Sequence, residues 1–335
     1  MTERSPARPP FIVVRDDVTR SMPADDALNG AVAAIGNFEG VHRGHRAVIG
    51  TALERARQLG RKAAVLTFEP HPRAIFNPGE PVFRLTDEAA KLRLLATTGL
   101  DGAIVMRFDV ALANLPAEDF VQRILVDRFA LAGVVAGFDF HFGRARSGSP
   151  DFLQAAGRRH GFTVDIVPPF ADRGVRISSG AIRAALSAGR VEEAAGMLGF
   201  PWFVSSDVIP GDRRGRELGF PTANMRLDPG CGLAHGVYAV RVGVGDRRFD
   251  GVANFGRRPM FDNGAVLLET FLFDFEGDLY GQRIDVAFIH WIRPELTFAS
   301  VEDLVQRMNE DCELARAALA RAPDAFPPIG AAQTS

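Results

Sequence analysis

Residues 31–45 read A-V-A-A-I-G-N-F-E-G-V-H-R-G-H, and this stretch decides the first half of the fold. A short apolar run ends at Ile35, a loop with three glycines follows, and a helical pattern begins near His45. Apolar runs of this length without alternation are typical of strands buried on both faces of a parallel sheet. The stretch therefore predicts a strand, a tight loop and a helix in direct succession.

The same alternation of apolar runs and helical patterns continues to Val167. After the first strand at 31–36, we expect strands at 63–68, 102–107, 133–138 and 162–167. Between them we expect helices near 45–59, 87–98, 117–129 and 151–160. Strands separated by helices predict an α/β domain of the Rossmann-like kind, with a parallel sheet covered on both faces.

The sequence after Pro201 shows a different pattern of apolar runs and turns. Turns rich in Gly, Asp and Pro separate expected strands at 204–209, 236–243, 248–253, 265–273 and 284–289. Because no helix intervenes, this pattern favours an antiparallel barrel or sandwich. A helical stretch at 181–198 joins the two halves. A final helix is expected after Ser300, which forms a capping pattern with Asp303.

Composition narrows the class of protein. The chain has 335 residues, 47% of them hydrophobic, and a formal net charge of −2, as expected for about two globular domains. A nucleic-acid binder would usually carry a basic surplus, and this chain has none. Cys231 and Cys312 are too few for a disulfide framework, so we expect reduced thiols and a cytoplasmic location. No apolar run is long enough to span a bilayer, so we expect no membrane partner.

The chain has only two lysines, Lys62 and Lys91, and neither follows a glycine. A Walker A loop needs the order Gly-Lys-Ser/Thr, and a protein-kinase strand needs its lysine in V-A-I-K. A protein of this composition that handles nucleotide phosphates must therefore use histidine, arginine, backbone amides and metal.

Polar clusters follow the predicted strands of the first half, where open α/β sheets bind ligands. In His42-Arg43-Gly44-His45, the glycine lets the backbone approach a ligand, and the new helix directs free N–H groups there. Two imidazoles can donate hydrogen bonds to phosphate oxygens. Two exposed histidines at a helix start explain the pattern equally well. A zinc site would need a third ligand, and the sequence shows no obvious one.

Other polar residues of this half are open to two interpretations. Ser178 and Ser179 can simply cap a helix, or they can bind a polyphosphate together with Arg183. His71, between two prolines, is as consistent with a structural role as with ligand contact.

Two features of the second half are typical of binding or catalytic sites. The run 211–224 is dense in glycine and can form a flap whose amides face phosphate, although most such runs are hairpin turns. Thr222 and Asn224 offer neutral oxygens suited to Mg²⁺. Glu269 lies in an otherwise apolar strand, where it acts either as a general base or as the partner of an arginine.

The first half resembles the adenylyltransferase module of bacterial bifunctional riboflavin kinase/FAD synthetases, which is similar to the HxGH nucleotidyltransferases. The resemblance lies in G-N-F-E-G-V-H-R-G-H (36–45), F-x-F-x-F-G-R-x-R-x-G (138–148) and I-S-S-x-x-I-R (177–183). It implies in-line attack of FMN on the α-phosphate of ATP, with pyrophosphate leaving and His42 and His45 catalytic. The implied ATP-binding residues are Gly36, Asn37, Phe38, Gly40, His42, His45, Ser178, Ser179 and Arg183, and the implied flavin-binding residues are Asp139, Phe140 and Phe142.

The second half resembles the riboflavin kinase module of the same enzymes. The matching motifs are G-R-E-L-G-F-P-T-A-N (215–224), G-V-A-N-x-G-x-x-P (251–259), L-E-x-x-L-x-D-F-x-G-D-L-Y-G (268–281) and R-x-E-x-x-F-x-S (293–300). The resemblance implies a Greek-key barrel, Mg²⁺ at Thr222 and Asn224, and Glu269 activating the ribityl 5′-hydroxyl. The implied ATP-binding residues are Gly215, Gly219, Pro221, Thr222 and Asn224.

Together the two resemblances predict an enzyme that converts riboflavin to FMN and FMN to FAD with ATP. We expect an adenylyltransferase domain at 12–185, a helical connector at 186–200 and a kinase domain at 201–325. Glu39 and Gly180 stand where the family usually has Asp and Thr, which leaves a second hypothesis open: a riboflavin kinase whose first domain is weakly active or only binds. A flavin-responsive RNA-binding regulator is a third hypothesis, and the neutral charge opposes it.

Overall fold

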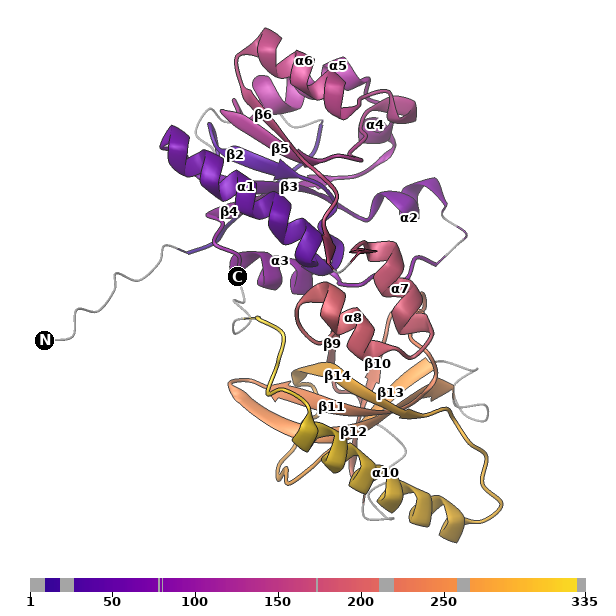
Figure 1. Cartoon of the computed structure of the whole chain (residues 1–335). Helices are drawn as coiled ribbons and strands as arrows, with labels where there is room; N and C mark the ends of the chain where they lie inside the picture. Colours follow the sequence, from indigo (N-terminus) through magenta and orange to yellow (C-terminus); the bar gives the residue numbers. More distant parts are fainter. Residues whose placement is uncertain are drawn as a thin grey trace, which may run out of the picture. The chain divides into compact units, whose positions relative to one another are not determined.

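The computed structural model describes residues 10–18, 27–77, 79, 81–172, 174–210, 220–257 and 266–329. Contacts divide the chain into two compact units (Figure 1). The first comprises Met1–Glu80 and Lys91–Arg176, and the second comprises Pro81–Ala90 and Ile177–Ser335. The division by function at 12–185, 186–200 and 201–325 concerns which residues serve which reaction, and it stays a prediction.

The first unit is built on a six-stranded sheet in the order β1-β4-β3-β2-β5-β6, with every neighbouring pair parallel. The strands are β1 (Ile12–Asp16), β2 (Val32–Ile35), β3 (Ala63–Glu69), β4 (Gly102–Arg107), β5 (Gly133–Gly137) and β6 (Thr163–Val167). The chain moves outward from β2 in one direction through β3 and β4, then returns beside β2 with β5. The strand order therefore reverses next to β2, where sheets of this class bind their ligands.

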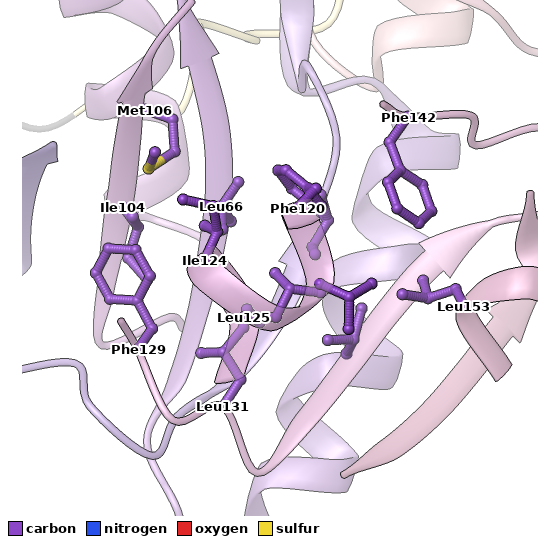
Figure 2. Close-up of a cluster of buried hydrophobic side chains, with 14 of the residues drawn as sticks. Leu66, Ile104, Met106, Phe120, Ile124, Leu125, Phe129, Leu131, Phe142 and Leu153 are labelled. Atoms are coloured by element: carbon purple, nitrogen blue, oxygen red, sulfur yellow. The ribbon is translucent and has the colours of Figure 1, made fainter. Parts of the chain in front are cut away.

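Helices cover both faces of this sheet, with α1 on one side and α5 and α6 on the other (Figure 1). On the second face, Phe120, Ile124 and Leu125 pack over the strand residues Leu66 and Ile104 (Figure 2). The short elements of the unit include a hairpin, β7 (Ala171–Asp172) and β8 (Val175–Arg176). The helices are α1 (Arg43–Leu59), α2 (Pro72–Phe76), α3 (Glu88–Ala96), α4 (Val110–Ala113), α5 (Ala117–Asp119) and α6 (Pro150–His160), with helical turns η1 (Glu39–Val41), η2 (Phe120–Val126) and η3 (Arg144–Arg146).

The second unit holds a six-stranded antiparallel sheet in the order β10-β13-β12-β11-β14-β9. A bridge between Ile209 and Asn224 brings the end of β9 to β10, so the sheet curls into a nearly closed barrel. The strands are β9 (Phe203–Asp207), β10 (Thr222–Arg226), β11 (Gly236–Val244), β12 (Arg247–Arg257), β13 (Val266–Leu272) and β14 (Arg283–Arg293). Helix α10 (Val301–Arg321) packs on β11, β12 and β14, and Ser300 caps its first turn by accepting from Asp303 N.

The predicted fold class is confirmed: a parallel α/β unit precedes an antiparallel barrel with a C-terminal helix. Strands β1 and β10 escaped prediction, because β1 is a short edge strand next to a polar tail and β10 continues a glycine-rich run. The helix expected at 181–198 is two helices, α7 (Ser179–Ser187) and α8 (Val191–Leu198). Gly189 separates them with φ 75°, in a position where a Cβ would lie 2.8 Å from the ring of Trp291.

Candidate functional site

The loop after β2 has an unusual backbone. Three of its residues have positive φ: Phe38 (48°), Gly40 (72°) and Val41 (42°). A left-handed conformation is ordinary for glycine but rare for phenylalanine and for a β-branched valine, whose side chains here are fully buried. Such strain persists only where surrounding structure fixes it, and it concentrates at ligand sites. The loop Gly36–Val41 is therefore a rigid turn at the switch point of the sheet.

The two histidines of the HxGH motif form one stacked pair. His42 is the N-cap of α1, and its Nδ1 accepts a hydrogen bond from the backbone N–H of His45 at 3.2 Å. The rings stack with centroids 3.6 Å apart and 14° between planes, and Phe38 meets His45 edge-on. Because His42 Nδ1 is an acceptor, its neutral ring carries the proton on Nε2, which is a hydrogen-bond donor. Among the described residues, His45 Nδ1 is buried without a hydrogen-bond partner.

Both imidazoles are held neutral. Burial lowers the pKa of His42 to about 4. Burial also lowers the pKa of His45 well below its ordinary value, with further contributions from electrostatic repulsion by protonated His42 and by Lys91. Gly44 between them leaves room for the ring of His42, since a Cβ there would make a tight contact with it at 3.2 Å. The pair offers neutral donors beside the start of a helix, where the helix dipole favours an anion.

A group of buried ionisable side chains lies next to this loop, and the sequence did not predict it. Lys91 Nζ lies 2.7 Å from Glu69 Oε1, and both side chains are almost fully buried. Glu39, also buried, has Oε2 3.6 Å from His71 Nε2. The sequence carried a signal for Lys91, because it is one of two lysines and lies within a buried helical pattern.

The three residues predicted to bind flavin lie after β5, in different environments. Asp139 is exposed and accepts a hydrogen bond from Arg176 at 2.9 Å. Phe140 is partly buried and stacks on Phe142, with ring centroids 5.5 Å apart. Phe142 itself belongs to the core, where it meets Phe120 (Figure 2). Asp139 and Phe140 are thus accessible from this strand end, and Phe142 supports Phe140 from below.

The Ser178-Ser179 motif opens α7, which belongs to the second unit. Ser178 is the N-cap and accepts from Ala181 N at 3.2 Å, so the capping interpretation is confirmed. Arg183 Nε donates to Phe83 O at 2.6 Å within the same unit. The joint action of these residues with the imidazole pair of the first unit stays a prediction.

The barrel places the kinase candidates in register. Thr222 and Asn224 lie two residues apart on β10, so their side chains share one face of the sheet. Asn224 pairs directly with Glu269 on β13, and Glu269 pairs on its other side with Asn254 on β12. Directly opposite residues point to the same face, so a carboxylate lies between two amides. Asn254 is an addition to the predicted set, and its motif G-V-A-N contained the signal.

Asn224 has an oxygen available for a ligand. Its side chain is 5% exposed, and its Nδ2 donates to Thr222 O at 3.3 Å. Its Oδ1 is buried and has no hydrogen-bond partner in the described part of the chain. A buried acceptor without a partner is costly, and a hard cation or its bound water satisfies it. Pro221 is exposed beside β10, and Gly215 and Gly219 lie outside the described residues.

Comparison with known proteins matches each unit to a family. A model described as FAD synthetase matches residues 24–181, and one described as riboflavin kinase matches residues 198–319. The bifunctional riboflavin kinase/FMN adenylyltransferase of Pseudomonas fluorescens is 42% identical over 292 residues, which cover 86% of this chain and 93% of the relative. The chain belongs to the bifunctional riboflavin kinase/FMN adenylyltransferase family. The Escherichia coli K12 member is 41% identical and covers 84% of this chain and 90% of its own.

The family assignment confirms the resemblance that the motifs indicated. A solved structure, that of a macrolide-efflux protein from Streptococcus pneumoniae, is also similar, with a TM-score of 0.80 and 29% identity. It covers 91% of this chain and 99% of that protein, so the fold is shared along nearly the whole length. None of the helices in the described ranges combines the length and the hydrophobicity that crossing a bilayer requires.

Proposed function

We propose that this chain makes FAD from riboflavin in two ATP-dependent steps, one served by the barrel and one by the parallel sheet. Membership of the bifunctional riboflavin kinase/FMN adenylyltransferase family, with one matching model over each half, carries the proposal. The two polar sites support it independently. Neither contains a P-loop lysine, and each offers donors suited to phosphate or to a metal-bound nucleotide.

The first step is phosphorylation of riboflavin. Glu269 takes the proton of the ribityl 5′-hydroxyl, the oxygen attacks the γ-phosphorus of ATP, and ADP leaves. The register of β10, β13 and β12 supports this role, because Glu269 lies between Asn224 and Asn254. Two neutral amides beside the carboxylate can orient it without adding charge. We assign ATP binding to Pro221, Thr222 and Asn224 together with Gly215 and Gly219.

We assign a magnesium ion to Thr222 and Asn224. The buried, unpartnered Oδ1 of Asn224 fits a hard cation, and the neutral donor set fits an ion whose charge is balanced by phosphates. When bound, magnesium would neutralise the charge that develops on the transferring phosphoryl group. Thr222 contributes its position on the same face of β10, two residues away.

The second step is adenylylation of FMN. A phosphate oxygen of FMN attacks the α-phosphorus of ATP in line, and pyrophosphate leaves. His42 and His45 donate hydrogen bonds to the phosphate oxygens as charge builds up, and their lowered pKa values suit neutral donors. Gly36, Asn37, Phe38 and Gly40 form the loop on which the nucleotide rests. We assign Ser178, Ser179 and Arg183 to the triphosphate as well.

Flavin contacts in the second step are assigned to Asp139 and Phe140, with Phe142 behind them. Phe140 offers a partly buried ring on which an isoalloxazine can stack, and Asp139 offers an exposed acceptor for its N–H. We further propose a cytoplasmic location, which the two free cysteines of the chain and the use of ATP support.

Product analysis tests the function directly. Purified protein is incubated with riboflavin, ATP and Mg²⁺, and the flavins are separated by chromatography. The proposal requires FMN to appear first and FAD to follow, with pyrophosphate released when FMN is supplied. FMN without FAD would favour the alternative in which the first unit only binds flavin or nucleotide. Absence of both products would reject the function.

A further inference from the structure

Lys91, on α3, is buried at the carboxyl ends of β2 and β3 in the first unit. Its side chain is 3% exposed, so the ammonium group does not reach solvent. Its Nζ lies 2.7 Å from Glu69 Oε1 and 3.1 Å from Thr67 Oγ1. Two backbone carbonyls, of Asn37 and Phe68, lie at 3.4 Å. One ammonium therefore joins the loop after β2 to the last residues of β3.

The choice of lysine at this position has a physical reason. All basic residues of the chain other than Lys62 and Lys91 are arginine or histidine. An ammonium is compact and directs three donors around one point, whereas a guanidinium is planar and needs a larger space. Thr67 donates its own hydroxyl proton to Asn37 O at 3.1 Å, which leaves its oxygen free to accept from Lys91. The groups around Lys91 Nζ therefore fit the compact ammonium of a lysine better than a guanidinium.

Lys91 acts on the residue that precedes the strained part of the loop. Asn37 contributes its carbonyl to both Lys91 and Thr67, and Phe38 follows at once with φ 48°. Backbone in this region returns to ordinary geometry unless its neighbours fix it. The contacts at Asn37 therefore hold the loop in the conformation that leads into the His42 cap and α1.

The charge of Lys91 also acts on the imidazole pair. It is one of the causes that lower the pKa of His45, after burial and after the charge of His42. Glu69 lies 2.7 Å from this cation, so the charges of the Lys91–Glu69 pair offset each other.

We propose that Lys91 is a positioning residue for adenylyl transfer, which fixes the loop Gly36–Val41 and the imidazole pair by holding Asn37 against the end of β3. This inference rests on the proposed function of the first unit. Because Lys91 is buried, it acts through Asn37 and does not touch substrate. This positioning lowers the barrier to adenylyl transfer, because the loop amides and imidazoles must be correctly oriented when negative charge develops on the α-phosphate.

The test uses the full chain with Lys91→Met and Glu69→Gln together, which removes both buried charges and leaves neither unpaired. Lys62→Met is the matched control, since it removes the other lysine, an exposed one that donates to Ala27 O. Adenylylation of supplied FMN and phosphorylation of riboflavin are measured on each variant. We expect kcat for FAD formation to fall roughly 10- to 100-fold in the double variant, while KM for ATP and FMN changes by less than about threefold.

Riboflavin kinase activity of the same preparation reports on folding, and it should match the wild type in all variants. Unchanged FAD formation, a rise in KM alone, or a parallel loss of both activities would each overturn the positioning role. The same loss of FAD formation in Lys62→Met would also overturn it, because the effect would then not depend on the buried site. Wild-type protein that forms no FAD would instead defeat the proposed function, and this inference with it.

Discussion

Asn224 and Glu269 lie directly opposite each other on strands β10 and β13 of the barrel. Side chains at directly paired positions point to the same face, with Cβ atoms about 5 Å apart. The pairing joins the residue assigned to the metal-bound nucleotide with the residue assigned to deprotonate the flavin hydroxyl. Under this assignment, the register of the sheet would hold the nucleotide next to the flavin hydroxyl.

Replacing Glu269 by glutamine tests the base. Glutamine keeps the size and removes the proton acceptor, so FMN formation should fall by about 10²-fold or more. FAD formation from supplied FMN should stay at the wild-type rate. Glu276→Gln, at an exposed glutamate of the same chain segment, serves as the control and should change neither activity. Equal loss of both activities in Glu269→Gln would show that the carboxylate serves folding.

Asn224→Leu separates ligand binding from stability. The Oδ1 of Asn224 has no hydrogen-bond partner among the described residues, and a buried unpaired acceptor costs about 1–3 kcal/mol. Leucine removes that cost at similar volume, so the Tm should stay equal or rise. Riboflavin kinase activity should fall about 10²-fold. Thermal unfolding and kinase assays on one preparation check both; a lower Tm with retained activity would contradict the assignment.

The imidazole pair is tested by His42→Ala combined with His45→Ala. Loss of both donors should reduce FAD formation from FMN by about 10²-fold or more, because neither ring can then meet the developing charge. Phosphorylation of riboflavin should continue at the wild-type rate. His160→Ala removes a histidine of the same unit that lies at the end of α6, and it should leave both steps unchanged. If the double variant also phosphorylated riboflavin more slowly, the assignment of the two reactions to separate units would be wrong.

Much of this architecture follows from the sequence. The apolar runs of 31–35 and 63–68 identified buried parallel strands because such strands need no alternation, and β2 and β3 lie there. Strand β10 escaped because its five residues follow a glycine-rich run, and only pairing with β13 reveals them as a strand. Strand existence in such a case depends on the neighbour, which local sequence does not specify.

Candidate site residues could be named from the sequence where a motif contains them. They could not be named where only the fold shows that they are buried or which residues they contact. The paired histidines and Glu269 are uncommon residues in recognisable motifs. Lys91 is one of only two lysines, but its contact with Asn37 O requires two segments 54 positions apart to meet. The position of Asn254 next to Glu269 likewise follows only from the register of β12 with β13.

The stability of the first unit should depend on pH through His42. Burial lowers its pKa to about 4, so the unfolded chain, with a pKa near 6.5, binds the proton more readily. The neutral ring therefore contributes stability that is fully present above pH 6.5 and is lost as the pH falls through 4. His42→Asn keeps a good N-cap and removes the titration. Between pH 8 and pH 5, the wild type should lose roughly 2 kcal/mol more than this variant.

Urea unfolding at both pH values measures the difference. Trp202 and Trp291, the two tryptophans of the chain, both belong to the second unit. A transition seen by far-UV circular dichroism without a change in tryptophan fluorescence therefore reports the first unit. Identical pH dependence in wild type and His42→Asn would show that the ring is not held neutral by folding.

Gly180→Thr should raise the rate of FAD formation. The motif resemblance implies a threonine at this place, and a hydroxyl at the start of α7 can add a hydrogen bond to phosphate. The position has room, since an added Cβ would meet only Ser178 Oγ, at 3.9 Å, among the described atoms outside its chain neighbours. Gly180→Ala is the control, because it adds a Cβ and a larger gain in helix propensity than threonine, without the hydroxyl. We expect kcat for adenylylation to rise severalfold with threonine and to stay constant with alanine, with riboflavin kinase activity unchanged in both. A threonine variant no faster than alanine would show that a hydroxyl at this position does not contribute to adenylyl transfer.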